Sequence, residues 1–208
     1  SVVKAYFPLD RMVEAVFDGA NRLFGLSFEA RPEIRAYHPD VKVYEVRGRD
    51  GAQIGVFLHD NFARPSKRSG AWMSNYRQQS RNTAGGSAVT PIVVNNNNFA
   101  KGAPGEPTLL SFDDARTLFH EFGHGLHGLL SSVTYERLSG TNVLRDFVEL
   151  PSQLFEHWLT EPEVLKKHAR HHRSGEPIPD ALAAKLHAAR RFNQGYETVR
   201  YTASALTD

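Results

Sequence analysis

The chain has 208 residues, which is enough for one domain with a buried core, a formal net charge of +2 and no cysteine. Mixed charges with so small an excess give no reason to expect nucleic acid or a membrane as partner, and no apolar run is long enough to span a bilayer. Without cysteine there are no disulfides or thiolate ligands, so any zinc site must use nitrogen and oxygen donors.

The first half of the chain predicts one helix followed by a small sheet at about 41–94. Apolar residues recur at helical spacing over residues 9–24. Segments rich in β-branched or aromatic residues predict strands at 41–46, 53–58 and 91–94, with a hairpin turn at Asp50-Gly51. Runs of Gly, Pro and Asn predict loops at 85–86, 95–98 and 104–107. The sheet could offer an edge strand to an extended peptide or serve as plain scaffold, and the sequence leaves both open.

A longer amphipathic helix is expected at about 113–130. Ser111, with Asp114 three residues later, is typical of a capping box at a helix start. The motif H-E-F-G-H then runs from His120 to His124. Because residues four apart share a helix face, both imidazoles can hold one metal ion. Glu121 can reach the water on that metal as a general base, so the motif predicts a zinc metallopeptidase.

His127 lies on nearly the same helix face, but seven residues of helix place it about 10 Å from His120. We therefore expect His127 to contact the ligands without binding the metal itself, or to lie in the core. The longer motif H-E-x-x-H-x-x-G-x-x-H is not completed, because positions 127 and 130 are His and Leu. This favours glutamate as the third ligand. Glycines at 123, 125 and 128 cost about 1 kcal/mol each in a helix, which predicts close approach of a neighbouring element or substrate.

A second amphipathic helix is expected at about 146–159, with Pro151 near its first turn. Asp146, Glu149 and Glu156 would share one face of this helix. Acids on an otherwise apolar helix are costly unless they are paired or bind metal, so this face should meet the zinc helix. Two histidines and one glutamate form a standard catalytic zinc set, and Glu149 is the expected third ligand. Asp146 and Glu156 are expected to orient a ligand imidazole through its other ring nitrogen.

The C-terminal part predicts further helices. A basic stretch at 166–173 is expected to form a solvated helix face. Residues 180–191 and 193–206 are expected to form two helices that buttress the site.

Several stretches together resemble the thimet oligopeptidase and neurolysin family of zinc peptidases. They are H-E-F-G-H-G-L-H-G at 120–128, S-G-T-N at 139–142, R-D-F-V-E-L-P-S-Q at 145–153 and E-H-W at 156–158, with Y-H-P-D at 37–40, F-A-R-P-S-K-R-S-G-A-W-M at 62–73 and F-N-Q-G-Y-E at 192–197. Within that family they are most similar to the bacterial peptidyl-dipeptidase branch, which removes dipeptides from free C-termini. The resemblance covers nearly the whole chain.

This resemblance implies Zn²⁺ as cofactor, with His120, His124 and Glu149 as ligands and Glu121 as catalytic base. It implies short peptides as substrates and a mainly α, zincin-like fold with a small β-sheet (α+β) and a deep cleft. Members of the family are several times longer, so residues 1–208 are expected to be one partial catalytic domain. Its expected partners are an N-terminal helical domain and a C-terminal loop, rich in tyrosine and histidine, that closes on the substrate.

Two alternatives to dipeptide release stay open at this point. The chain could belong to an endopeptidase of the same family, or it could bind zinc but be inactive without the closing loop. A cytoplasmic location is expected.

Overall fold

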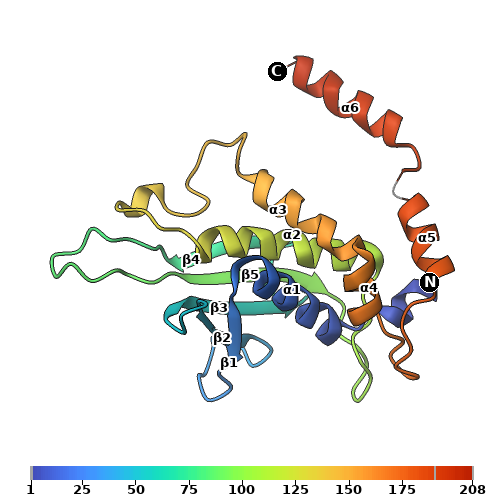
Figure 1. Ribbon diagram of the computed structural model, residues 1–208, viewed down its shortest axis with the longest axis horizontal. Coiled ribbons are helices and arrows are strands. Elements are labelled where there is room, and N and C mark those ends of the chain that lie inside the picture. The colour runs from blue at the N-terminus through green and yellow to red at the C-terminus, as the bar shows by residue number, and fades with distance from the viewer. Residues whose placement is uncertain (1, 190, 208) are drawn as a thin grey trace.

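A five-stranded mixed sheet in the order β1-β2-β3-β5-β4 forms the base of the structure (Figure 1). The computed structural model describes residues 2–189 and 191–207. β3 and β5 are parallel, and the other neighbours are antiparallel, which leaves β1 and β4 at the edges. The strands are β1 (Ser27–Ala30), β2 (Lys42–Arg47), β3 (Gln53–Phe62), β4 (Trp72–Arg77) and β5 (Ile92–Phe99).

Helices cover one face of this sheet, so the chain has the α+β class expected. Two long helices, α1 and α2, lie against the sheet, and α3 lies on the side of α2 that faces away from the sheet (Figure 1). The helical elements are η1 (Val2–Tyr6), α1 (Leu9–Phe24), α2 (Phe112–Leu129), η2 (Glu136–Leu138), α3 (Glu149–Glu156), η3 (His157–Thr160), α4 (Pro162–His168), α5 (Asp180–Ala189) and α6 (Gln194–Thr207). No helix in the described part of the chain combines the length and apolar character needed to cross a membrane.

The main core joins α1, α2 and the sheet through aromatic side chains. Phe17 of α1 stacks on Phe28 of β1 with ring centroids 4.2 Å apart, and it lies 5.7 Å from Phe122 of α2. Phe57 of β3 meets Phe122 edge-on at 5.5 Å. Such pairs add about 0.5–1.5 kcal/mol each to the burial of apolar area. They fix the face of α2 opposite to the one that carries the histidine motif.

The start of α2 is also fixed locally. The Ser111 hydroxyl accepts a hydrogen bond from the Asp114 N–H at 3.0 Å, and the Ser111 N–H donates to the Asp114 carboxylate at 2.9 Å. The predicted capping box is therefore confirmed, and such caps contribute about 1 kcal/mol. By setting where α2 begins, the cap determines which residues face the sheet and which face away from it.

The predicted hairpin and the helix at 9–24 are confirmed. Gly51 has a φ of 79°, and β2 and β3 pair antiparallel across the turn. The reading of residues 95–98 as a loop is wrong, because β5 continues through them and pairs with β3 on one side and β4 on the other. The structure also adds the edge strands β1 and β4, and the sheet extends beyond 41–94 because β1 precedes this range and β5 ends at Phe99.

The two C-terminal helices behave differently from each other. α5 packs against the core through Leu182, Ala183 and Leu186. α6 runs away from the body of the molecule, and its described side chains are exposed (Figure 1). The expectation that both helices buttress the site is therefore wrong for α6, whose amphipathic pattern predicts a helix but not what it packs against.

Candidate metal centre

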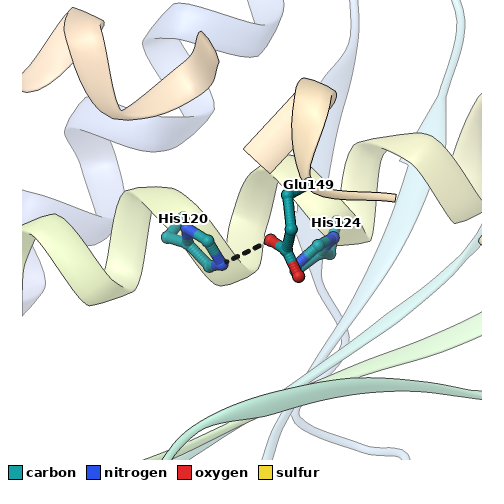
Figure 2. Close-up of side chains that lie close together, drawn as sticks. All are labelled: His120, His124 and Glu149. Atoms are coloured by element: carbon teal, nitrogen blue, oxygen red, sulfur yellow. Dashed lines mark ion pairs between the residues drawn. The ribbon is translucent and has the colours of Figure 1, made fainter. Parts of the chain in front are cut away.

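His120 and His124 lie one turn apart on α2, and both face Glu149 at the start of α3. The Nε2 atom of each imidazole is 3.2 Å from the same carboxylate oxygen, Oε2 of Glu149. Figure 2 shows the Glu149 carboxylate between the two rings. One ligand atom from each residue lies within 4.8 Å of the others, and no second group of this kind occurs in residues 2–189 or 191–207. Three donors from two helices therefore converge on one point.

The donor set fits a catalytic metal ion. Two imidazole nitrogens and one carboxylate oxygen are a standard set for catalytic zinc, which keeps a further position for water. The Glu149 side chain is 51% exposed and that of His120 25%, so the group is open to solvent. A structural zinc site would instead be closed by four protein ligands.

Glu156 lies behind His120, where a residue that orients this imidazole is expected. Its Oε1 is 2.7 Å from His120 Nδ1, which leaves Nε2 directed toward Glu149. Burial by itself would lower the pKa of His120, but Glu156 and the neighbouring acids Glu121 and Glu149 raise it on balance. The hydrogen bond therefore fixes both the ring orientation and the nitrogen that is free to bind.

Asp146 is not brought to the histidines. It is exposed, α3 begins only at Glu149, and no hydrogen bond or ion pair in the described part of the chain joins Asp146 to His120 or His124. Pro151 explains the late start, because proline lacks an N–H and is tolerated only in the first turn of a helix. A helix from 146 would place Pro151 in its interior. The expectation that Asp146 orients a ligand imidazole therefore has no support from the structure.

His127 is kept apart from the group of possible ligands, as the helix rise requires. Its ring lies 6.2 Å from Phe147, and it lines an apolar cavity with Leu126, Leu130 and Trp158. Its Nδ1 atom is buried without a hydrogen-bond partner among the described residues, and burial lowers its pKa.

Glu121 is buried beside the three possible ligands, with 6% of its surface exposed. Its Oε2 atom has no hydrogen-bond partner in the described structure. Burial raises the pKa of Glu121 to about 7, against the opposing charge of His120. An unpaired buried carboxylate oxygen is costly, and this cost would be removed by a partner from outside the chain.

The close approach predicted at the helix glycines is confirmed. A Cβ on Gly123 would lie 2.7 Å from Ser152 Cα in α3, and one on Gly128 would lie 2.6 Å from the Met73 side chain in β4. A Cβ on Gly125 would lie 3.0 Å from the side-chain oxygen of Asn95 in β5. These three glycines let a different element approach α2 at each position.

Replacing Gly123 by Ala is expected to weaken metal binding by about tenfold or more. The added Cβ would meet the backbone of Ser152 and Pro151, so α3 must move and carry Glu149 away from the histidines. The free energy of unfolding should also fall by about 1–3 kcal/mol, as overpacking usually costs. Calorimetric zinc titration and urea unfolding measure both effects. Gly195→Ala in α6, where nothing lies within 4 Å, is the control, and equal effects in both variants would contradict the argument.

The sequence pattern does not predict that Asn95 contacts the H-E-F-G-H motif. Asn95 lies within the asparagine run at 95–98, whose composition predicts a loop, yet its side-chain amide donates a hydrogen bond to the Glu121 carbonyl. The signal that could have revealed it is Pro91–Val94, a β-rich segment that continues into the run.

Comparison with known proteins places this chain in a family. The model of Peptidase family M3 matches residues 1–208. Dipeptidyl carboxypeptidase of Escherichia coli (strain K12) is 48% identical over 99% of the chain, and oligopeptidase A of the same organism is 37% identical over 99%. Organellar oligopeptidase A of Arabidopsis thaliana is 34% identical over 99%. The chain spans 27–30% of the length of these relatives. Because the family model covers the whole chain, the resemblance to the oligopeptidases is confirmed and the chain belongs to Peptidase family M3.

Proposed function

We propose that this chain is the metal-binding part of a zinc metallopeptidase with a zincin-like fold that releases dipeptides from the C-termini of short peptides. The observation that carries the proposal is the convergence of His120, His124 and Glu149 beside the buried carboxylate of Glu121. The similarity to a protein named dipeptidyl carboxypeptidase supports the product class.

Each residue of the site has a distinct role in this reaction. His120, His124 and Glu149 would hold a zinc ion, which when bound lowers the pKa of its water toward about 7 and polarises the scissile carbonyl. Glu121 accepts the proton of the attacking water at its free oxygen and passes it to the leaving amine. Glu156 keeps the His120 ring in the orientation that binds.

The sheet supplies a place for the peptide. β4 is an edge strand, and its Met73 and Asn75 lie against Gly128 of the motif helix. An edge strand offers unpaired backbone groups to an extended chain. Of the two roles open for the sheet, binding the peptide is therefore favoured over plain scaffold.

The alternative product pattern is internal cleavage. The similarity to proteins named oligopeptidase A supports it, because the same ligands and base would serve an endopeptidase. A chain that spans about 30% of its relatives could also bind zinc without turnover.

Zinc content and reaction products test the proposal together. After chelation and reloading, the purified chain should hold one zinc, and Glu149→Ala should lose it. Zinc retained in full by this variant would show that Glu149 is not the third ligand, and would point to Glu156, whose carboxylate also contacts His120. Mass spectra of the products should show C-terminal dipeptides from a free peptide and none from its C-terminally amidated form. Internal fragments from both peptides would indicate an endopeptidase, bound zinc without products would indicate a binding segment only, and no bound zinc would overturn the proposal.

A further inference from the structure

Asn95 connects the sheet to the catalytic turn of α2. It lies in β5, between β3 and β4, and is 1% exposed. Its Nδ2 donates to the backbone carbonyl of Glu121 at 2.7 Å. In a helix this carbonyl already accepts the N–H four residues later, so Asn95 is an additional partner. The bond joins the sheet to the residue proposed as the base.

This contact has a cost in stability. The Oδ1 atom of Asn95 is buried without a hydrogen-bond partner among the described residues, which is unfavourable. The helix opposite it has Gly125, where a Cβ would lie 3.0 Å from Oδ1. Asn97 in the same strand also has a buried Oδ1 without a partner among the described residues, so two features distinguish Asn95: Gly125 opposite it and its hydrogen bond to the Glu121 carbonyl.

α2 is contacted by α3 on one side and by the sheet on the other. Glu149 comes from α3, which contacts α2 at Gly123. Asn95 contacts α2 from the opposite side, and its hydrogen bond is to none of the three possible ligands. A change at Asn95 therefore alters how α2 sits over the sheet, while the ligands keep their places relative to one another.

We propose that Asn95 is a positioning residue. Its hydrogen bond fixes the distance between the sheet and the turn of α2 that contains Glu121, so that the Glu121 carboxylate reaches a peptide bound at the sheet edge. The inference rests on the proposed function. It assigns Asn95 a part in turnover that is separate from metal binding.

The test compares Asn95→Ala with Asn97→Ala. Asn97 is the matched control, because it lies in the same strand, is fully buried and donates from its Nδ2 at 2.9 Å, but to Asn61 of β3. With zinc-loaded protein and a peptide substrate, Asn95→Ala should lower kcat by about tenfold or more, since misplacing a reacting group is costly. KM and the zinc Kd should change by less than about threefold, because ground-state and metal binding are untouched. Asn97→Ala should leave kcat unchanged.

A purely structural role would give a different pattern. An unchanged kcat in Asn95→Ala, an equal loss in Asn97→Ala, or a loss of zinc affinity that matches the loss of kcat would overturn the proposal. In a Glu121→Gln background, Asn95→Ala should lower kcat no further, because it acts through Glu121.

Two measurements separate this inference from the proposed function. In the metal-free chain, the ¹³C resonance of the Glu121 carbonyl should move in Asn95→Ala and not in Asn97→Ala, and no movement would overturn the contact. If the zinc-loaded parent shows no turnover, binding of a hydroxamate-capped dipeptide replaces kcat as the readout, because its hydroxyl would donate to the Glu121 carboxylate as the attacking water does, which a substrate in the ground state does not. Asn95→Ala should then weaken its binding by about tenfold, and unchanged binding would overturn the inference.

Discussion

Replacing Glu121 by Gln is expected to lower peptide hydrolysis by about 10²–10⁴-fold, the usual contribution of a general base. Gln has nearly the same shape but cannot accept the proton of the attacking water. The zinc content should remain at one per chain, because Glu121 is not among the three converging donors. Initial rates of dipeptide release, with zinc measured on the same samples, give both quantities.

Stability of the metal-free Glu121 variant provides a second readout with a definite sign. Burial raises the pKa of Glu121 to about 7, above its unfolded value of about 4.3. Its contribution is therefore fully present below pH 4.3 and is lost as the pH rises through 7. Without metal at pH 8, Glu121→Gln should accordingly have a higher Tm than the parent. Glu106→Gln, an exposed loop change, is the control, and hydrolysis at the parent rate by Glu121→Gln would exclude Glu121 as the base.

The parts of the site that could be predicted are those whose geometry is local. His120 and His124 share a helix face whatever the rest of the fold does, since the helix period fixes their relation. The capping box at Ser111 likewise lies within four residues. Glu149 is an exception, because it lies on a different helix from the histidines: an acid on an otherwise apolar helix needs a partner, and this pattern predicts that its face meets α2.

The parts that could not be predicted depend on contacts between distant segments. Asn95 is 26 residues from Glu121, and a buried asparagine is favourable only if its partner is present. Asp146 differs for a local reason: α3 begins at Glu149, so that Pro151 falls in its first turn, and Asp146 is left outside the helix. For α6, periodicity predicts the helix correctly, but no local pattern says what it packs against.

The same argument applies to Asp60 at the end of β3, which sequence reasoning also missed. Its carboxylate is fully buried and accepts two hydrogen bonds from the Arg64 guanidinium at 2.7 Å, one from Lys67 at 3.2 Å and one from the Tyr37 hydroxyl at 2.9 Å. Lys67 is also almost fully buried. These bonds tie the segment that leads to the edge strand β4 onto the sheet.

Asp60→Ala is expected to lower the free energy of unfolding by about 3–5 kcal/mol, because it leaves the buried charge of Lys67 without its partner. This is a large part of the roughly 5–15 kcal/mol that stabilises a domain. Urea unfolding measures the change. Asp10→Asn, which breaks an ion pair with Lys42 in which both side chains are mostly exposed, should have a much smaller effect. A similar loss in both variants would show that the buried network adds nothing beyond surface charge.

The acid stability of the chain should report the same network. Burial would raise the pKa of Asp60, but hydrogen bonds from Arg64, Tyr37 and Lys67 outweigh it and lower the pKa below the usual value. Because the folded pKa is lowered, this stabilisation is complete above the unfolded pKa of about 3.9 and is lost as the pH falls through the folded value. The parent should therefore lose stability below about pH 4 more steeply than Asp60→Asn, which has no carboxylate to protonate. Parallel pH profiles for the two proteins would mean that Asp60 is not the group that titrates, and the bonds that hold the segment before β4 would then have to be sought among its other contacts.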